Sequence, residues 1–222
     1  MLGWMHYLGR GTVRDQLKGV KAIQDSRSIG FPFGENECLA ARLWTACGPP
    51  ASRKFFGLCQ SGSDRDWLCR HLTAVCLIEG FGTRRDKSRG VEIAEQLAHD
   101  GHSDSQYWIG RCYYFGWGVV EDHKKALEWF SKSADQGNSY GQLGVGEYCY
   151  FGDGAAEDHA KAFECFRLSA EQGNRHGQLG LGACFKNGYG VTRDIDTALF
   201  WYRKSAESGL REALDSLEEL GQ

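Results

Sequence analysis

The sequence has little proline and no long apolar run. Only 3 of its 222 residues are proline, whereas 30 are glycine, so glycine is expected to mark the turns. No apolar stretch approaches the roughly 20 residues that a transmembrane helix needs. Residues 1–6 lack the basic flank and uninterrupted apolar core of a signal peptide. We therefore expect a cytoplasmic protein without direct membrane insertion.

The chain also lacks a strong charge of one sign. Its formal net charge of −3 gives no global attraction to nucleic acid, so nucleic acid is not expected as a partner. The one short basic run, residues 84–89, is interrupted by Asp86 and is interpreted as a solvated turn. The nine cysteines are scattered, odd in number and without a CxxC pair, which argues against a disulfide framework or a zinc site and favours a reducing compartment.

Catalytic motifs are missing as well. The sequence contains no GxSxG elbow, Walker loop, HExxH or kinase signature. His123 and His159 follow expected helix caps and are interpreted as exposed residues of the first helical turn. His99 and His102 lie on either side of a predicted helix end and are not expected to bind a metal. We predict a protein that is not an enzyme, with no catalytic residue, metal or cofactor.

What the sequence does contain is a repeat of 36 residues. Four positions each recur four times at this spacing, which is close to the periods of known helix-turn-helix repeats. The recurring residues are Gly80, Gly116, Gly152 and Gly188; Gly82, Gly118, Gly154 and Gly190; Asp86, Asp122, Asp158 and Asp194; and Gly101, Gly137, Gly173 and Gly209.

Each repeat is expected to contain two helices, here called helix A and helix B. In the best example, residues 139–151 have apolar residues at helical spacing and are predicted to form helix A, which Gly152 ends. Asp158 is a suitable N-cap for helix B. Ala162, Phe166 and Ala170 are its predicted core contacts, and Gly173 ends it. Cys76, Cys112 and Cys184 share one position of helix A and are predicted to be buried core residues.

The segment IGRCYYFGWGV, residues 109–119, resembles the "LGxxYxxGxGV" signature of the Sel-1-like repeat family, a relative of the tetratricopeptide repeats. Asp122, Ala126, Trp129 and Gly137 continue the family's second half. The departures are Gly141 and Gly177, which stand where the family has alanine and should loosen helix A, and Cys149, which replaces an aromatic residue. The resemblance implies an all-α, right-handed superhelical solenoid of antiparallel helix pairs.

We expect residues 1–222 to form a single solenoid. Residues 1–30 are a truncated repeat, so either a preceding segment of a longer protein or a partner is expected to cap it, and end-to-end homodimers are possible there. Residues 31–68 are a degenerate repeat with a helix A at 38–47, a break at Pro49 and Pro50, and a short helix B at 53–60. Clear repeats follow at 69–102, 103–138, 139–174 and 175–210. A capping helix within 211–222 is expected to pack with Ala213, Leu214, Leu217 and Leu220 on one side.

The resemblance also implies where a partner would bind. By analogy with the tetratricopeptide groove, the concave face is lined by the third, seventh and tenth residues of each helix A. These residues are His71, Val75, Ile78, Tyr107, Arg111, Tyr114, Leu143, Glu147, Tyr150, Leu179, Ala183 and Lys186. Tyrosine and arginine are typical of binding hot spots, which favours a groove for a peptide or helix over a merely solvated face.

Three functional classes remain open. The family resemblance implies an adaptor or scaffold that binds protein partners. A regulatory repeat segment of a larger enzyme, such as a kinase, would explain the truncated first repeat. A hydrolase is the remote alternative, because cysteine-rich members of the family have been linked to β-lactam hydrolysis. Those members also join two positions equivalent to Cys59 and Cys69 by a disulfide, but here the spacing is longer and no other repeat has the pair.

Overall fold

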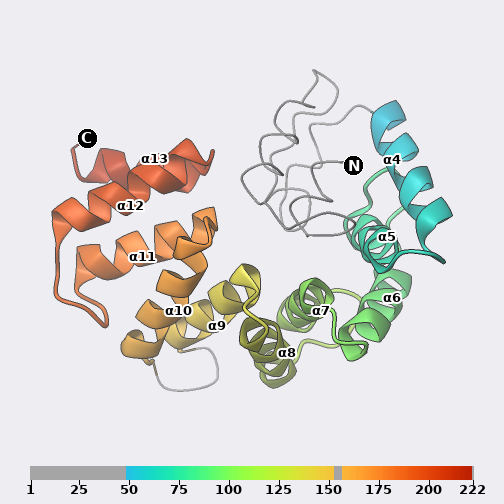
Figure 1. Cartoon of the computed structure of the whole chain (residues 1–222), viewed down its shortest axis with the longest axis horizontal. Helices are drawn as coiled ribbons and strands as arrows, with labels where there is room; N and C mark the ends of the chain where they lie inside the picture. Colours follow the sequence, from blue (N-terminus) through green and yellow to red (C-terminus); the bar gives the residue numbers. More distant parts are fainter. Residues whose placement is uncertain (1–48, 153–156, 222) are drawn as a thin grey trace. The chain divides into compact units, whose positions relative to one another are not determined.

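The computed structural model describes residues 49–152 and 157–221 (Figure 1). All regular secondary structure in these two ranges is α-helical, and consecutive helices pack in pairs. The described helices are α4 (Pro49–Gly62), α5 (Trp67–Glu79), α6 (Lys87–His99), α7 (Ser103–Phe115), α8 (His123–Asp135), α9 (Ser139–Phe151), α10 (His159–Glu171), α11 (Arg175–Asn187), α12 (Ile195–Glu207) and α13 (Arg211–Glu219).

The chain divides into two compact units, residues 1–93 (unit 1) and 94–222 (unit 2), with the boundary inside α6. In unit 1, α4 packs against α5, and the rings of Phe55 and Phe81 meet edge to face at a centroid distance of 5.8 Å. Gly90 at the start of α6 lies so close to α5 that a Cβ atom there would be 2.6 Å from Ile78. Unit 2 holds the three clear repeats 103–138, 139–174 and 175–210, followed by α13.

The expected break at Pro49 and Pro50 is wrong. Helix α4 begins at Pro49 and continues for 14 residues to Gly62, so it is longer than the predicted helix at 53–60. The physical reason is that proline lacks only an amide that has no intrahelical partner in the first turn, and its fixed φ suits a helix start. The predicted helix A at 38–47 and the truncated repeat 1–30 lie outside the described residues.

Glycine ends helix A in all four described repeats, as the repeat pattern predicts. Gly80, Gly116, Gly152 and Gly188 adopt φ angles of 77°, 63°, 67° and 76°, in the left-handed region that other residues rarely enter. Their amides donate to the carbonyls four residues earlier. The chain then reverses within a few residues, which brings helix B antiparallel to helix A.

Aspartate begins helix B. The side chains of Asp122 and Asp158 accept hydrogen bonds from the amides of Lys125 and Lys161, at 3.0 and 2.9 Å. Asp194 accepts from two amides of α12. Each bond satisfies an amide that would otherwise lack an intrahelical partner. The predicted N-caps are therefore confirmed at these positions.

Small and aromatic residues of helix B form the core of each repeat. Ala126, Ala162 and Ala198 have no exposed surface. One turn later, the rings of Phe130, Phe166 and Tyr202 lie directly over a glycine of helix A in their own repeat, where a Cβ atom would be within 2.8 Å of the ring. Those glycines are Gly110, Gly146 and Gly182. The cysteines predicted to be core residues, Cys76, Cys112 and Cys184, are fully buried.

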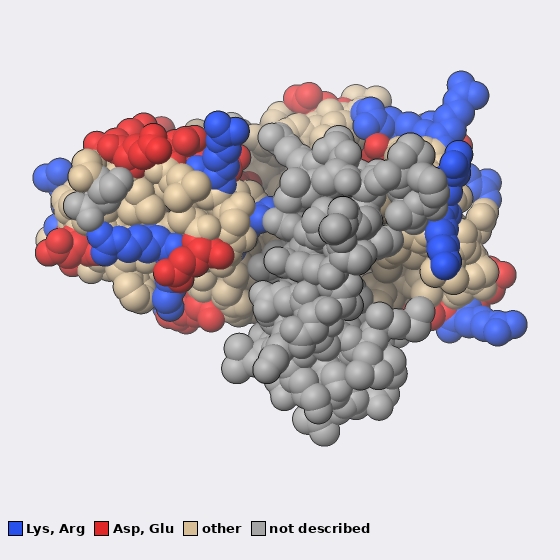
Figure 2. Space-filling view, turned by 90° about the horizontal axis from the view of Figure 1, so that it is seen from above, with Lys and Arg blue, Asp and Glu red and all other residues tan. Residues whose placement is uncertain are grey.

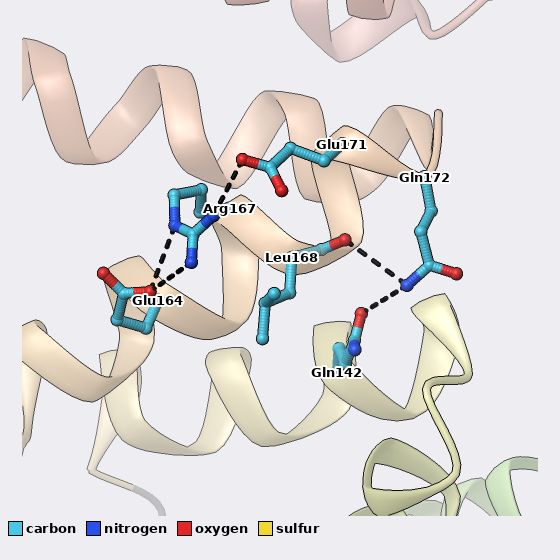
Figure 3. A network of polar contacts seen from close by, with 6 residues as sticks. All are labelled: Gln142, Glu164, Arg167, Leu168, Glu171 and Gln172. Atoms are coloured by element: carbon cyan, nitrogen blue, oxygen red, sulfur yellow. Dashed lines mark hydrogen bonds and ion pairs between the residues drawn. The ribbon is translucent and has the colours of Figure 1, made fainter.

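Hydrogen bonds join the end of helix B to the start of helix A in the same repeat. Near the end of helix B, the hydroxyls of Ser133, Ser169 and Ser205 donate to the first carbonyl of helix A, at 2.8, 2.7 and 2.8 Å. The amide of Gln172 donates to the Oε1 atom of Gln142 at 2.8 Å (Figure 3). Gln136 makes the equivalent bond to Gln106. The serine bond recurs in all three repeats and the glutamine bond in repeats 103–138 and 139–174, and both fix how helix B lies on helix A.

Helix α13 occupies the place of a further helix A. Ala213 is fully buried, as predicted for a capping helix, and the Lys186 ammonium of α11 pairs with the Glu219 carboxylate at 2.7 Å. The prediction for Leu214 is wrong, because this side chain is 50% exposed. Leu217 and Leu220 are only partly buried. Residues at these positions of a full helix A are covered by helix B, and no described helix takes that place on α13.

Candidate protein-binding face

The helices A of unit 2 line its inner side. Helix α9 packs against both α7 and α11, whereas the helices B, α8, α10 and α12, make at most marginal contact with one another. Closer spacing of the helices A means that they lie on the shorter, inner side of the curved stack. We call their predicted partner-facing residues the A-helix face. It consists of Tyr107, Arg111, Tyr114, Leu143, Glu147, Tyr150, Leu179, Ala183 and Lys186.

The predicted residues differ in accessibility. On the A-helix face, Glu147 is exposed, whereas Leu143 is only 5% exposed. The other residues of the face are partly buried, namely Tyr107, Arg111, Tyr114, Tyr150, Leu179, Ala183 and Lys186. In unit 1, His71, Val75 and Ile78 are buried at 0%, 0% and 1% exposure. The accessible part of the predicted set therefore lies in unit 2, on α7, α9 and α11.

Arg111 lies among aromatic rings. Its guanidinium carbon is 5.0 Å from the ring centroids of both Trp108 and Trp117, and 5.7 and 6.0 Å from those of Phe115 and Tyr107. These distances are within the range of cation–π attraction. Phe115 and Trp117 are stacked on each other at 4.9 Å. The rings restrict the long arginine side chain, so less rotamer entropy is lost when a partner binds it.

Tyr114 is held by a ring cluster on α7, α8 and α9. Its ring meets those of Phe115, His123 and Tyr148 edge to face, at centroid distances of 4.7, 5.0 and 5.5 Å. The Tyr148 hydroxyl donates to the His123 carbonyl at 2.9 Å. The Nε2 atom of the same histidine lies 3.0 Å from Glu121. Tyr114 is thus fixed in place while the residue as a whole stays partly exposed.

Tyr150 repeats this arrangement one unit later. Its ring contacts those of Phe151, His159, Phe166 and Tyr189 at centroid distances of 4.9 to 6.0 Å. The rings of His159 and Tyr189 are parallel and 4.3 Å apart. Burial raises the pKa of the Tyr150 hydroxyl above its usual value, so this side chain stays neutral in the physiological range and acts as a hydrogen-bonding, apolar surface.

Charges alternate along the A-helix face. Arg111 on α7 is followed by Glu147 on α9 and by Lys186 on α11, and Lys186 is paired with Glu219. Burial raises the pKa of Tyr107, while the nearby Arg111 charge lowers it and the Glu147 charge raises it. Both charges therefore act on the same tyrosine. The face offers fixed aromatic surface together with positively and negatively charged side chains.

The sequence interpretation missed two kinds of residue at this face. His123 and His159 are not simply exposed first-turn residues, because both are half-buried against tyrosine rings. Phe115 and Phe151, the last residues of α7 and α9, are 46% and 64% exposed. Their recurrence at a spacing of 36 residues is the sequence signal that marks all four positions.

The remaining predicted features concern cysteines and metals. Cys59 and Cys69 are free thiols in this structure; burial and the neighbouring Cys69 raise the pKa of Cys59 to about 12. Residues 49–152 and 157–221 contain no group of three or more acidic, histidine or cysteine side chains that could hold a metal ion. Within the same ranges, no helix has the length and apolar content needed to cross a membrane.

Comparisons with known proteins point to one family. A family model described as Sel1 repeat matches residues 1–21, 68–102, 103–138, 139–174 and 175–210. No curated protein matches the chain significantly. A solved Sel1 repeat protein from Oxalobacter formigenes is similar over 100% of this chain and 75% of its own, with 20% identity and a TM-score of 0.65.

A second solved structure is c5321, a protective antigen of uropathogenic Escherichia coli strains that displays an SLR fold. It is similar over 99% of this chain, with 28% identity and a TM-score of 0.64. The matched region is 47% of that antigen, so the present chain spans less than half of its length.

Proposed function

Because this chain belongs to the Sel1 repeat family, we propose that it is a non-catalytic adaptor or scaffold that binds a peptide or helix of a partner protein on its A-helix face. Sel1 repeat proteins are typically protein-interaction scaffolds. Solenoids of this type offer extended concave surfaces for such partners. The free thiols of the described residues support action in a reducing compartment such as the cytoplasm.

The observation that carries the proposal is the pair of fixed, partly accessible tyrosines, Tyr114 and Tyr150. They stand at equivalent positions of successive repeats, and each is held by at least three ring contacts. Rigid aromatic side chains provide large contact areas at a low entropic cost, which is why tyrosine is enriched in binding hot spots.

The alternating charges on the same face would orient the partner. A bound segment that places an acidic group near Arg111 and a basic group near Glu147 matches the face in one direction only. Such pairs contribute more to specificity and to the association rate than to affinity. End-to-end pairing through the first repeat concerns residues outside the described part of the chain and stays a prediction.

The test is site-specific photo-crosslinking in lysate of the source cell. A photoreactive amino acid replaces Glu147 on the A-helix face, or Glu128 on α8 as a control, since both side chains are exposed. We expect a protein to be crosslinked from position 147 and not from position 128. The substitution set Tyr114→Ala, Arg111→Ala and Tyr150→Ala should abolish the crosslink.

Two controls make the result decisive. Circular dichroism must show unchanged helicity in the triple variant, because its tyrosines also pack within the repeats. Lys186→Glu, which reverses a charge on the face without removing a ring, should weaken the same crosslink. Equal crosslinking from positions 147 and 128, unaffected by these variants, would show that the A-helix face is not the binding site.

A further inference from the structure

Helix α13 carries an apolar stripe that the other helices A bury. Leu214 and Leu217 of α13, and Leu220 directly after it, lie 36 positions after Gln178, Leu181 and Cys184 of α11. The α11 residues are 6%, 1% and 0% exposed, whereas Leu214 is 50% exposed and the other two leucines are partly exposed. All three residues are leucine, so these positions expose apolar surface, whereas the equivalent positions of α11 are buried.

The preceding repeats show what covers such a stripe. In the three repeats from 103 to 210, helix B packs on helix A with one of its rings over a glycine. In α13 the position of that glycine, equivalent to Gly182, is taken by Glu218. A side chain at this position would collide with a ring in the family arrangement, since even a Cβ atom on Gly182 would lie 2.6 Å from Tyr202. A helix that docks on α13 must therefore place a different group opposite Glu218.

The charges of α13 indicate which group this is. The helix contains four acidic residues and a single basic one, Arg211. Glu219 is paired with Lys186 of α11, while Glu212, Asp215 and Glu218 are exposed. Figure 2 shows acidic side chains gathered along one edge of this end of the molecule. In repeats 103–210 a ring of helix B contacts the glycine at the position equivalent to Glu218. On α13 a lysine or arginine of the docked helix would instead form an ion pair with Glu218.

We propose that α13 is a second docking surface, which binds a basic amphipathic helix of a partner protein in the place that helix B takes in the complete repeats. The partner's apolar side chains pack on Leu214 and Leu217, and its lysine or arginine side chains pair with Glu218 and Asp215. This mode of recognition, an amphipathic helix on an apolar surface bordered by opposite charge, is common among helix-binding proteins. The α13 surface is distinct from the A-helix face, to which the Lys186–Glu219 ion pair connects it.

The test uses the whole chain and a fluorescent, helix-forming peptide composed only of leucine and lysine, with the leucines on one face. We expect saturable binding by fluorescence anisotropy that weakens with added salt, because exposed charges are screened. A peptide with glutamate in place of every lysine should not bind. Leu214→Gln, which introduces the residue of the equivalent α11 position, should weaken binding about tenfold, equivalent to about 1.4 kcal/mol.

Matched variants separate this surface from other leucines and from the A-helix face. Leu168 on α10 is 40% exposed, so Leu168→Gln should leave peptide binding unchanged. Glu218→Lys should weaken binding of the lysine peptide and create binding of the glutamate peptide. The triple variant of Tyr114, Arg111 and Tyr150 should bind the lysine peptide normally, even if the crosslinking experiment fails.

Two outcomes would overturn the proposal. One is peptide binding that Leu214→Gln and Leu168→Gln weaken equally, which would indicate non-specific adsorption. The other is self-association of the wild-type chain, measured by light scattering, that Leu214→Gln abolishes. In that case the occupant of the α13 surface is a second copy of this chain.

Discussion

Gly141 and Gly177 lie in helices where alanine is the better helix former, by about 1 kcal/mol per residue. The structure explains why glycine is present. A Cβ atom on Gly141 would lie 2.5 Å from the amide nitrogen of Ala134 and 2.6 Å from the Ser133 side chain, both in the preceding helix B. Gly177 meets Ser169 and Ala170 in the same way. Close approach of successive repeats outweighs helix propensity at these positions.

This predicts opposite effects for two similar substitutions. Gly141→Ala should lower the free energy of unfolding by about 1–3 kcal/mol, because backbone atoms must move apart. Gly57→Ala in α4 should raise it by about 0.5–1 kcal/mol, since a Cβ atom there meets nothing within 4 Å. Urea unfolding followed by circular dichroism measures both. A stabilised Gly141→Ala variant would show that the close contact relaxes freely.

Gln178 is another residue whose environment departs from the repeat. Its Oε1 atom is buried without a hydrogen-bond partner among the described residues. The equivalent atoms of Gln106 and Gln142 accept from Gln136 and Gln172. The fourth repeat has Ser208 at the donor position, and this shorter side chain leaves the acceptor unsatisfied. A buried unsatisfied polar atom lowers stability.

Ser208→Gln should therefore stabilise the chain, by about 1 kcal/mol, the typical net contribution of a hydrogen bond. The reciprocal change, Gln172→Ser, removes the bond shown in Figure 3 and should destabilise by a similar amount. Both are measured by thermal or urea unfolding. If both variants have wild-type stability, these glutamine pairs contribute nothing to the fold.

At the scale of a helix, capping positions decide where each element begins. Asp194 accepts hydrogen bonds from the amides of Asp196 and Thr197 and from the Thr197 hydroxyl, at 3.0, 3.2 and 2.6 Å. The bonds from Thr197, and then the one from Asp196, lower the pKa of the Asp194 carboxyl. Only the ionised carboxylate makes all of these bonds, so the start of α12 depends on its charge.

Asp194→Ala is expected to lower the thermal unfolding midpoint by a few degrees at neutral pH. Because the folded-state pKa is lowered, the stabilisation is fully present above the unfolded-state value of about 4 and is lost as the pH falls through the folded-state pKa. The two proteins should therefore converge in acid. Asp135→Ala, at the last residue of α8, is the control and should cause no such loss. A difference independent of pH would exclude the charged cap as the cause.

At the scale of the whole molecule, the main helix contacts of the described residues join helices of the same repeat or of neighbouring repeats, so stability should be local along the chain. Ser169 joins the two helices of one repeat through its bond to the Ser139 carbonyl and lies against Gly177 of the next repeat. A defect at this position affects α9, α10 and α11 directly. Neither of these two contacts reaches α7 or α13.

Hydrogen exchange should reveal this locality. Ser169→Ala should reduce amide protection in α9, α10 and α11 by several-fold, with little change in α7 and α13. Mass spectrometry of peptic fragments resolves these segments. Uniform loss of protection across residues 94–221 would show instead that the whole unit opens in one cooperative step.

The sequence alone determined the helix pairs of the repeats with a regular spacing of 36 residues. Glycine at a helix end and aspartate at a helix start act through the backbone of their own segment, so their recurrence at 36 residues was enough to place α9, α10 and the turns between helices. The buried cysteines and alanines followed from helical periodicity. Local chemistry also explains why the break predicted at Pro49 is wrong. Proline occurs both in the first turn of a helix and where a helix is interrupted, so its presence alone does not distinguish the two cases.

Only the tertiary structure decided which surfaces are open. Whether Leu214 is buried depends on a helix that either covers it or does not, and its helical periodicity is the same in both cases. Likewise, His71 and Tyr107 hold equivalent positions in successive helices A, yet one is fully buried and the other partly accessible. The exposure of a residue depends on which helices cover it, and these helices can be distant in the sequence. A repeat pattern within one chain does not specify which residues they cover.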